Sequence, residues 1–200
     1  MPYHIYIPWL RENYFTQIKN PKILEIGVDA GQSMLPIIQN FTFANLAFEY
    51  TGLDIKRDEN LLIALSNFLK SAHQSVRYII ENSLEWLPKC NEQYDIILID
   101  GDHNYQTVYE ELKYIPKLLR SGGIVICDDY QNSQWSEKDL YYSTRDSHSN
   151  IDISTKPPPN GELKKVGVKA AVDDFLLENP GWTLSVGNDI CEAVVIRRGN

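Results

Sequence analysis

Two short apolar runs of the sequence end abruptly in acidic residues. The run IILI is followed by DGDH (100–103), and the run GIVIC is followed by DD (128–129). Three carboxylates that converge without a cation repel one another and raise one another's pKa values. A hard divalent ion such as Mg²⁺ removes that conflict, so Asp100, Asp128 and Asp129 are predicted metal ligands. The structural alternative is that one or two of these aspartates cap helices.

Asp102 and His103 stand at the predicted start of the helix that follows the first acid. Either side chain can accept a proton from a substrate hydroxyl, because carboxylates and neutral imidazoles both act as general bases. Asp102 could equally be a hydrogen-bond acceptor behind the site, and His103 a capping or packing group. The sequence leaves the choice of catalytic base open between these two residues.

A glycine-containing turn follows an apolar run in ILEIGVDAGQS. Gly27 and Gly31 allow the backbone to turn tightly and to approach a ligand closely. The spacing differs from the G-x-G-x-x-G of dinucleotide-binding turns, which makes a dehydrogenase the weakest of the functions considered. Glu25 precedes the first glycine, and an acid there suits an ammonium or sulfonium group better than a phosphate.

Polar residues also follow two further apolar runs. Asp54 ends TGLD, and an acid at this place in a nucleoside-binding α/β domain accepts hydrogen bonds from both ribose hydroxyls. Asn82 and Ser83 follow VRYIIE, where they could face an adenine base or cap the helix that begins at SLEW. The predicted cofactor-binding set consists of Glu25, Gly27, Gly31, Asp54, Asn82, Ser83 and Asp100.

The elements that must position these residues alternate along the chain. Strands are predicted over 22–28, 47–55, 76–82, 94–100 and 123–129, and in WTLSVGN and CEAVVIRR, joined by a turn at Gly187-Asn188. Helices are predicted from the glycine turn to about residue 39, and over 58–72, 83–90, 105–119 and 166–180. This alternation indicates a parallel sheet covered on both faces, which binds ligands beyond the carboxyl ends of its strands.

The segment 131–165 breaks the alternation, because it is polar and is interrupted by three prolines at 157–159. A loop of this length is uncommon within a compact domain and is typical of a lid, a binding loop or a disordered segment. Since it directly follows the acids at 128–129, we expect a lid over the site, within a single domain spanning 1–200.

Composition narrows the class of protein. The net charge is −8, from 19 basic and 27 acidic side chains, and no basic run stands out. Such a chain is a poor candidate for binding nucleic-acid phosphates. No secretory leader is evident and no apolar stretch approaches the ~18 residues of a membrane span. The three scattered cysteines are interpreted as buried free thiols. We therefore expect a cytoplasmic protein with a small-molecule substrate, and leave a homo-oligomer open.

The order of these motifs resembles that of class I S-adenosylmethionine-dependent methyltransferases. LEIGVDAGQS, GLDI, IIENS, ILIDGDHNY, LLRSGG and CDDY succeed one another over 23–130, and GVKAAVDDFLLENPGW extends the likeness toward the C-terminus. The resemblance implies an α/β, Rossmann-like, doubly wound fold. Its seven-stranded sheet is expected to be mostly parallel, in the order 3-2-1-4-5-7-6, with strand 7 antiparallel.

Within this class, the pair IDGDH and DDY is similar to the metal-dependent O-methyltransferases of the catechol and macrocin types. The resemblance places the metal on Asp100, Asp128 and Asp129. Asp129 is closer to the sugar-modifying macrocin type, since catechol-type enzymes have Asn there. Catechol-type enzymes carry a lysine base where this chain has His103, whereas macrocin-type enzymes use an aspartate at the position of Asp102.

The residues and the resemblance together predict methyl transfer from S-adenosylmethionine to a hydroxyl oxygen of a small molecule or sugar, assisted by Mg²⁺. Two alternatives remain open. One is a metal-independent methyltransferase that acts on nitrogen or on a carboxyl group. The other is a catalytically silent nucleoside-binding module.

Overall fold

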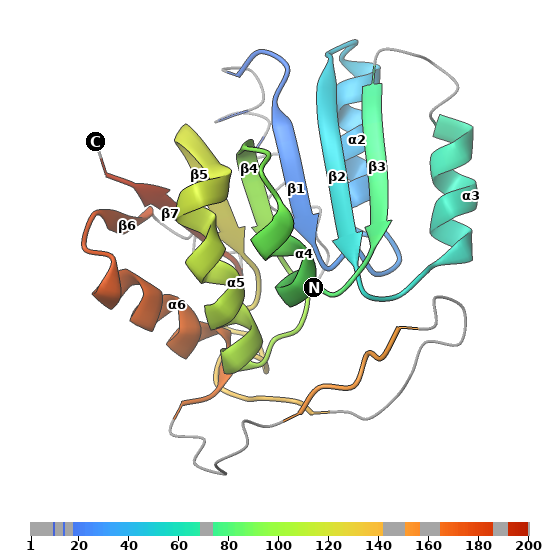
Figure 1. Ribbon diagram of the computed structural model, residues 1–200. Coiled ribbons are helices and arrows are strands. Elements are labelled where there is room, and N and C mark those ends of the chain that lie inside the picture. The colour runs from blue at the N-terminus through green and yellow to red at the C-terminus, as the bar shows by residue number, and fades with distance from the viewer. Residues whose placement is uncertain are drawn as a thin grey trace.

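The structure, a computed structural model, describes residues 10, 14, 18–68, 74–141, 151–156, 165–185 and 192–199. A seven-stranded sheet in the order β3-β2-β1-β4-β5-β7-β6 forms its centre (Figure 1). The strands are β1 (Lys22–Ile26), β2 (Phe48–Asp54), β3 (Gln74–Ile80), β4 (Tyr94–Ile99), β5 (Leu119–Cys127), β6 (Trp182–Ser185) and β7 (Val194–Arg198). β7 runs antiparallel to β5 and β6, and the other neighbouring strands are parallel. The predicted fold is confirmed.

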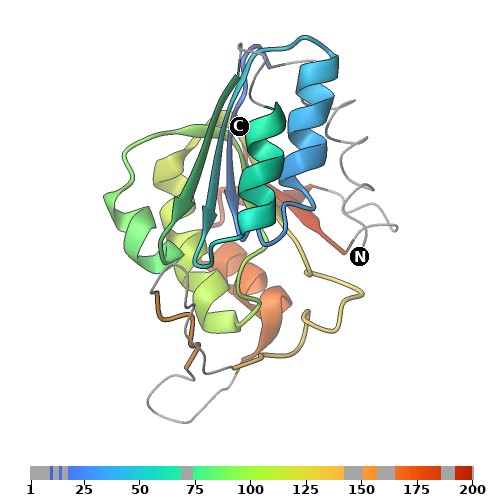
Figure 2. The same ribbon diagram turned by 90° about the vertical axis from the view of Figure 1, so that its right-hand side faces the viewer.

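Helices cover both faces of the sheet, as Figure 2 shows edge-on. On one face lie α2 (Met34–Phe43) and α3 (Glu59–Phe68). On the other face lie α4 (Ser83–Trp86), the 3-10 helix η3 (Leu87–Lys89), α5 (Tyr105–Leu118) and α6 (Gly167–Glu178).

The central strands are apolar on both sides because each side meets a layer of helices. In β4, Ile97 and Ile99 belong to the cluster formed with α5 and α6, whereas Ile96 and Leu98 belong to the cluster formed with α2 and α3. All four side chains are buried. Burying each contributes roughly 1.5–3 kcal/mol relative to exposure. The continuous apolar runs of the sequence are thus explained by two-sided burial.

The connection into β5 differs from the sequence prediction. The sequence predicted that a Ser-Gly-Gly turn would separate the helix from a strand beginning at residue 123, whereas β5 begins at Leu119, directly after α5. Tyr94 pairs with Leu119 and Ile96 with Ile124, so the glycines lie in a bulge between these two pairs. Gly122 has φ +78° there, a conformation that a residue without Cβ adopts at little steric cost.

Some predictions fall on residues outside the described ranges, namely 142–150 and 157–164 of the expected lid, the Gly187-Asn188 turn, and Cys191. The described parts of the expected lid, 131–141 and 151–156, lie beyond the carboxyl ends of the strands in both views (Figures 1 and 2). Cys90 and Cys127 are buried free thiols, as predicted. In the described ranges, no helix combines the length and the apolar character needed to cross a membrane.

Candidate active site

Acidic side chains gather at the carboxyl edge of the sheet, where β4 and β5 end side by side. Asp100 directly follows β4, and Asp128 and Asp129 directly follow β5. Backbone hydrogen bonds hold both strand ends, because Asp100 N donates to Ile26 O at 2.8 Å and Asp128 N donates to Ile99 O at 3.0 Å. Asp129 then turns with φ +57°. Residues that are far apart in the sequence therefore meet at one place, as predicted.

His103 lies between two of these acids. Its Nε2 is 2.8 Å from Asp129 Oδ2 and 3.5 Å from Asp100 Oδ1. This buried nitrogen nevertheless makes no aligned hydrogen bond with any described residue. One ligand atom from each of Asp100, His103 and Asp129 lies within 4.8 Å of the other two. We call these three residues the acidic cluster. It unites two of the predicted metal ligands with a residue predicted as a base.

Asp128 is not part of the acidic cluster, but the charges of Asp100 and Asp129 affect its pKa. Burial, followed by the charges of Asp100 and Asp129, raises the pKa of Asp128 to about 7. The same negative charges disfavour ionised Asp128 but favour the protonated, positively charged form of His103. Burial lowers the pKa of His103, but the close carboxylates of Asp100 and Asp129 outweigh burial and raise it to about 10. The strand ends thus carry the excess negative charge that the sequence suggested.

Asp102 is engaged by the beginning of α5. Its Oδ1 accepts a hydrogen bond from Asn104 N at 3.3 Å, and its Oδ2 accepts from Asn104 Nδ2 at 3.1 Å and Thr107 Oγ1 at 2.6 Å. Asn104 is buried and in turn accepts a hydrogen bond from Leu140 N at 2.6 Å. Asp102 therefore ties the helix start to the segment after β5, and His103 is the residue of the pair that faces the other acids.

Asp54 braces the glycine turn from the end of β2. Its Oδ2 accepts hydrogen bonds from Val28 N and Asp29 N at 2.8 and 2.7 Å, and its Oδ1 accepts one from Lys56 N at 2.7 Å. A carboxylate oxygen has two accepting positions, so Oδ2 is filled and Oδ1 keeps one. The sequence predicted two ribose hydroxyls as donors to Asp54. The observed contacts leave room for one of them without rearrangement of the turn.

The glycine turn is constrained by the chain itself. Gly27 has φ +85°, and a Cβ on it would lie 2.1 Å from Asp100 O. Only glycine therefore allows β1 and β4 to end this close together, and Gly31 shares the positive φ. Beneath the turn, the side chain of Glu25 is buried and accepts a hydrogen bond from Tyr50 Oη at 2.6 Å. Burial raises the pKa of Glu25 well above its usual value, against the opposing effect of Tyr50.

Asn82 and Ser83 follow β3 at the same edge of the sheet. Asn82 Oδ1 accepts a hydrogen bond from Leu84 N at 2.9 Å and caps α4, one of the two roles that the sequence allowed. The Ser83 hydroxyl instead donates to Glu111 Oε1 at 2.6 Å. Side chains that were predicted to bind a nucleoside are thus also braced by the protein around them.

Two residues near the site were missed from the sequence. Glu111 carries a signal that could have been used, because it lies in the apolar stripe of α5 formed by Val108, Leu112 and Ile115. An acid in such a stripe needs a specific partner. Trp135 stacks on the His103 ring, with 5.6 Å between ring centroids and 12° between planes. It lies in the irregular segment after β5, which has no periodicity from which a side chain can be placed.

Comparison with known proteins decides the family. A family model described as a methyltransferase domain matches residues 24–130, which is more than half of the chain. The chain belongs to this methyltransferase family. The matched range contains every predicted site residue, from Glu25 to Asp129.

Two curated proteins are similar to part of this methyltransferase. An uncharacterised protein of Acanthamoeba polyphaga mimivirus is 33% identical over 124 residues, which cover 56% of this chain and 53% of that protein. The ribosomal RNA small subunit methyltransferase H 1 of Agathobacter rectalis is 24% identical over 123 residues, covering 54% of this chain and 35% of that protein. The matched part of the chain thus spans about half or less of these relatives.

Solved methyltransferases share the fold. The SAH-bound Podospora anserina methyltransferase PaMTH1 aligns with a TM-score of 0.54 and 15% identity, covering 100% of this chain and 88% of that chain. MycE from the mycinamycin biosynthetic pathway, in complex with Mg, SAH and mycinamycin VI, aligns with a TM-score of 0.60 and 17% identity, covering 97% of this methyltransferase and 49% of MycE. At such low identity the likeness concerns the fold.

Proposed function

We propose that this methyltransferase moves a methyl group from S-adenosylmethionine to a hydroxyl oxygen of a small molecule or sugar, with Mg²⁺ at the carboxyl edge. The observation that carries the proposal is the acidic cluster, which stands at the carboxyl ends of β4 and β5 in a methyltransferase sheet. The shared fold of MycE, which was solved with Mg and SAH, supports the choice of metal.

The donor set fits a divalent ion. Carboxylate oxygens are the ligands that Mg²⁺ prefers, and Asp100 and Asp129 present two of them within one small space. Burial, and after it the charges of Asp100 and Asp129, raise the pKa of Asp128, and a cation would relieve the part that comes from charge repulsion. We therefore assign the metal to Asp100, Asp128 and Asp129. When bound, the metal would polarise the acceptor hydroxyl and lower its pKa.

His103 is our choice for the base that takes the proton of the acceptor hydroxyl. Its Nε2 faces Asp100 and Asp129, whereas the carboxylate of Asp102 accepts hydrogen bonds from the start of α5. With a metal ion on Asp100 and Asp129, the carboxylates that keep the imidazole protonated would be neutralised, and His103 would then be able to accept a proton. Trp135 stacks on the ring and restrains its plane. Asp102 then acts indirectly, by fixing the loop that carries His103.

The cofactor is proposed to cross the carboxyl edge from β1 to β3. Gly27 and Gly31 hold the methionine end above Glu25, Asp54 receives a ribose hydroxyl at the remaining position of Oδ1, and Asn82-Ser83 borders the adenine. S-adenosylmethionine supplies the methyl group on its sulfonium. The contribution of these residues to the rate is orientation, since they hold the methyl carbon in line with the attacking oxygen.

Methyl transfer to a panel of hydroxylated compounds tests the proposal. The protein is incubated with S-adenosylmethionine carrying a deuterated methyl group, Mg²⁺, and sugars, catechols or aliphatic alcohols, and products are identified by mass spectrometry. We expect labelled ethers in the presence of Mg²⁺ and none in EDTA. Asp100→Ala should abolish transfer, whereas Asp95→Ala, at the opposite end of β4, should retain it.

Two results would contradict the proposal in different ways. Full transfer in EDTA and in Asp100→Ala would leave the metal-independent methyltransferase as the better account. If calorimetry detects no binding of S-adenosylmethionine or of its demethylated product, the cofactor assignment fails as a whole.

A further inference from the structure

Two helices that border the site begin without a side-chain cap of their own. α5 starts after Asn104 and α6 starts after Val166, and neither of these residues caps its helix with a side-chain hydrogen bond. Both helices begin at the carboxyl edge of the sheet (Figure 1). The first N–H groups of a helix have no partner within the helix, so they need acceptors from elsewhere. One carboxylate of the segment after β5 supplies an acceptor to both helices.

This carboxylate belongs to Asp139. Its Oδ1 accepts hydrogen bonds from Tyr105 N at 2.9 Å and Gly167 N at 2.6 Å, and its Oδ2 accepts one from Tyr141 Oη at 2.7 Å. A carboxylate oxygen has two accepting positions, so the protein itself fills both positions of Oδ1. The dipoles of both helices also favour a negative charge at their starts. Asp139 is therefore a shared cap that joins α5 to α6.

The start of α6 also holds the backbone of Trp135. The second N–H group of the helix, that of Val168, donates to Trp135 O at 3.2 Å. Gly167 allows the close approach of the two chains, since it has φ +80° and a Cβ on it would lie 2.2 Å from Ser136 O. Residues 135–139 are thus bound to α6 at both ends, through Trp135 O and through the side chain of Asp139. We call them the attached segment.

His103 is held by this arrangement from two directions. It lies two residues before Tyr105, whose N–H group is bound by Asp139. The His103 ring is also stacked on Trp135, which opens the attached segment, with 5.6 Å between ring centroids. One carboxylate therefore fixes both the loop that carries the imidazole and the indole against which the imidazole packs.

We propose that Asp139 is a positioning residue for methyl transfer, because it caps α5 and α6 together and thereby holds the imidazole of His103 beside the acceptor hydroxyl. The inference rests on the proposed function, in which His103 takes the proton of that hydroxyl. A base has to lie within hydrogen-bond reach of the proton, so a displacement of about 1 Å lowers turnover strongly. Cofactor binding should be unaffected, since it is assigned to the ends of β1, β2 and β3.

Proton NMR of the imidazole tests the positioning without an acceptor. The ring current of an indole shifts the signals of protons that lie over its face, so the ring signals of His103 should be displaced by Trp135. Their absence in His103→Gln assigns them. Asp139→Ala should return them toward the positions of an unstacked histidine. Asp139→Asn should preserve them, because its amide oxygen accepts both N–H groups and its amide nitrogen donates to Tyr141 Oη.

Turnover should follow the NMR result. With the panel compound that gives the largest yield of labelled ether, Asp139→Ala should lower kcat at least about tenfold and leave KM for S-adenosylmethionine within about twofold. Asp139→Asn should keep kcat within about threefold of wild type. Gly167→Ala displaces the attached segment by a second route, since its Cβ would meet Ser136 O, and should lower kcat similarly. This variant decides the question if Asp139→Ala folds poorly.

Two matched controls separate positioning from stability. Asp58→Ala removes the cap from the start of α3, where Asp58 accepts from Leu61 N at 2.8 Å. Gly122→Ala shares the positive φ of Gly167, +78° against +80°, but its Cβ would meet no described residue beyond its chain neighbours within 4 Å. Both controls should lose thermal stability and keep the His103 signals and the kcat of the wild-type protein.

The outcomes distinguish this inference from the function on which it rests. Unchanged His103 signals in Asp139→Ala and Gly167→Ala would overturn the inference, as would an equal loss of kcat in Asp58→Ala, while transfer by the wild-type protein would leave the proposed function standing. If the wild-type protein transfers no methyl group to any panel compound, the proposed function fails. The inference then fails with it, even where the His103 signals respond as expected.

Discussion

Strand β4 has Asp95 near its start and Asp100 directly after its end, and the two acids lie in opposite electrostatic surroundings. At the amino edge of the sheet, Asp95 Oδ2 accepts hydrogen bonds from Lys22 N at 2.7 Å and Arg120 Nη1 at 2.8 Å. At the carboxyl edge, Asp100 lies beside two further acids, and the imidazole of His103 is its ion-pair partner among the described residues.

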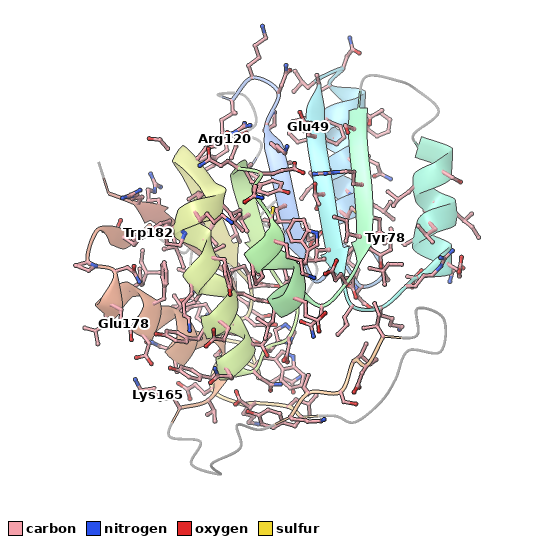
Figure 3. All side chains as sticks on the ribbon, viewed as in Figure 1. Glu49, Tyr78, Arg120, Lys165, Glu178 and Trp182 are labelled. Carbon is pink, nitrogen blue, oxygen red and sulfur yellow. The ribbon has the colours of Figure 1, made fainter. Side chains whose placement is uncertain are left out.

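The other acids named at the amino edge, like Asp95, are paired with basic side chains. Lys22 forms ion pairs with Glu49 and Glu92, and Arg77 holds both carboxylate oxygens of Glu92 at 2.8 Å. Figure 3 labels Glu49 and Arg120 at this edge. Hydrogen bonds from Arg77 and then from Lys22 lower the pKa of Glu92 to about 2. By contrast, the pKa values of Asp128 and Glu111 at the other edge are raised to about 7 and about 8.

The two edges of the sheet differ in whether their acids are paired with basic side chains. Acids that are paired by the chain stay ionised and have no need of an added cation. Acids that are buried beside one another keep an unbalanced charge, which a metal ion or a positively charged cofactor can balance. The contrast can be tested at both edges by removing one acid at a time.

The largest effect on binding is expected from Asp100→Ala. The acidic cluster loses one of its two carboxylates, so the affinity for Mn²⁺, used as a calorimetric probe of the proposed metal site, should fall at least about a hundredfold. Asp95→Ala is the matched control on the same strand and should leave Mn²⁺ affinity unchanged. Equal affinities in the two variants would mean that the edges do not differ as the contrast requires.

Replacing Glu111 by Gln should stabilise the protein relative to wild type by roughly 4 kcal/mol more at pH 8.5 than at pH 5. The pKa of Glu111 rises from 4.5 to about 8 on folding. Between these values the unfolded chain releases a proton that the folded protein keeps, so wild-type stability falls as the pH rises through this window. The variant lacks this loss, so its advantage should grow from pH 5 to pH 8.5 in urea unfolding. An advantage that is the same at both pH values would contradict the raised pKa.

Asp54→Ala should weaken binding of S-adenosylhomocysteine at least about tenfold, because it removes a charged acceptor and the brace of the glycine turn. Asp58→Ala serves as a control, since Asp58 caps the start of α3 by accepting from Leu61 N at 2.8 Å. That variant should lose some thermal stability and keep its ligand affinity. Calorimetry that finds unchanged affinity in Asp54→Ala would remove the cofactor from this strand end.

The smallest effect is expected from Glu92→Gln at the amino edge. Ion pairs this exposed contribute about 0–1 kcal/mol and are screened by salt. Because its pKa is lowered on folding, the contribution of Glu92 is present above its usual pKa and is lost as the pH falls toward 2. Urea unfolding should show a small loss of stability at neutral pH, and this loss should shrink in about 1 M salt. A loss that persists in salt would show that this edge is held by something besides charge.

The meeting of Asp100 with Asp129 was predictable, because parallel strands bring their carboxyl ends to one edge and both acids follow apolar runs. The strand order came from the resemblance to methyltransferases and not from the runs themselves. The pairing of His103 with Asp129 was beyond the sequence, since it depends on the turn that Asp129 takes after β5. The contact of Ser83 with Glu111 joins side chains 28 residues apart, and no local periodicity encodes such a pair.

The turn at Asp129 has a consequence for protein engineering. Its φ of +57° lies in the left-handed region, which glycine, asparagine and aspartate occupy most readily. The backbone therefore accepts those three residue types, whereas an ionised ligand requires aspartate or glutamate. Aspartate alone belongs to both groups. Asp100 is not among the described residues with positive φ, so a mutant library at the proposed metal site should vary position 100 and leave position 129 fixed.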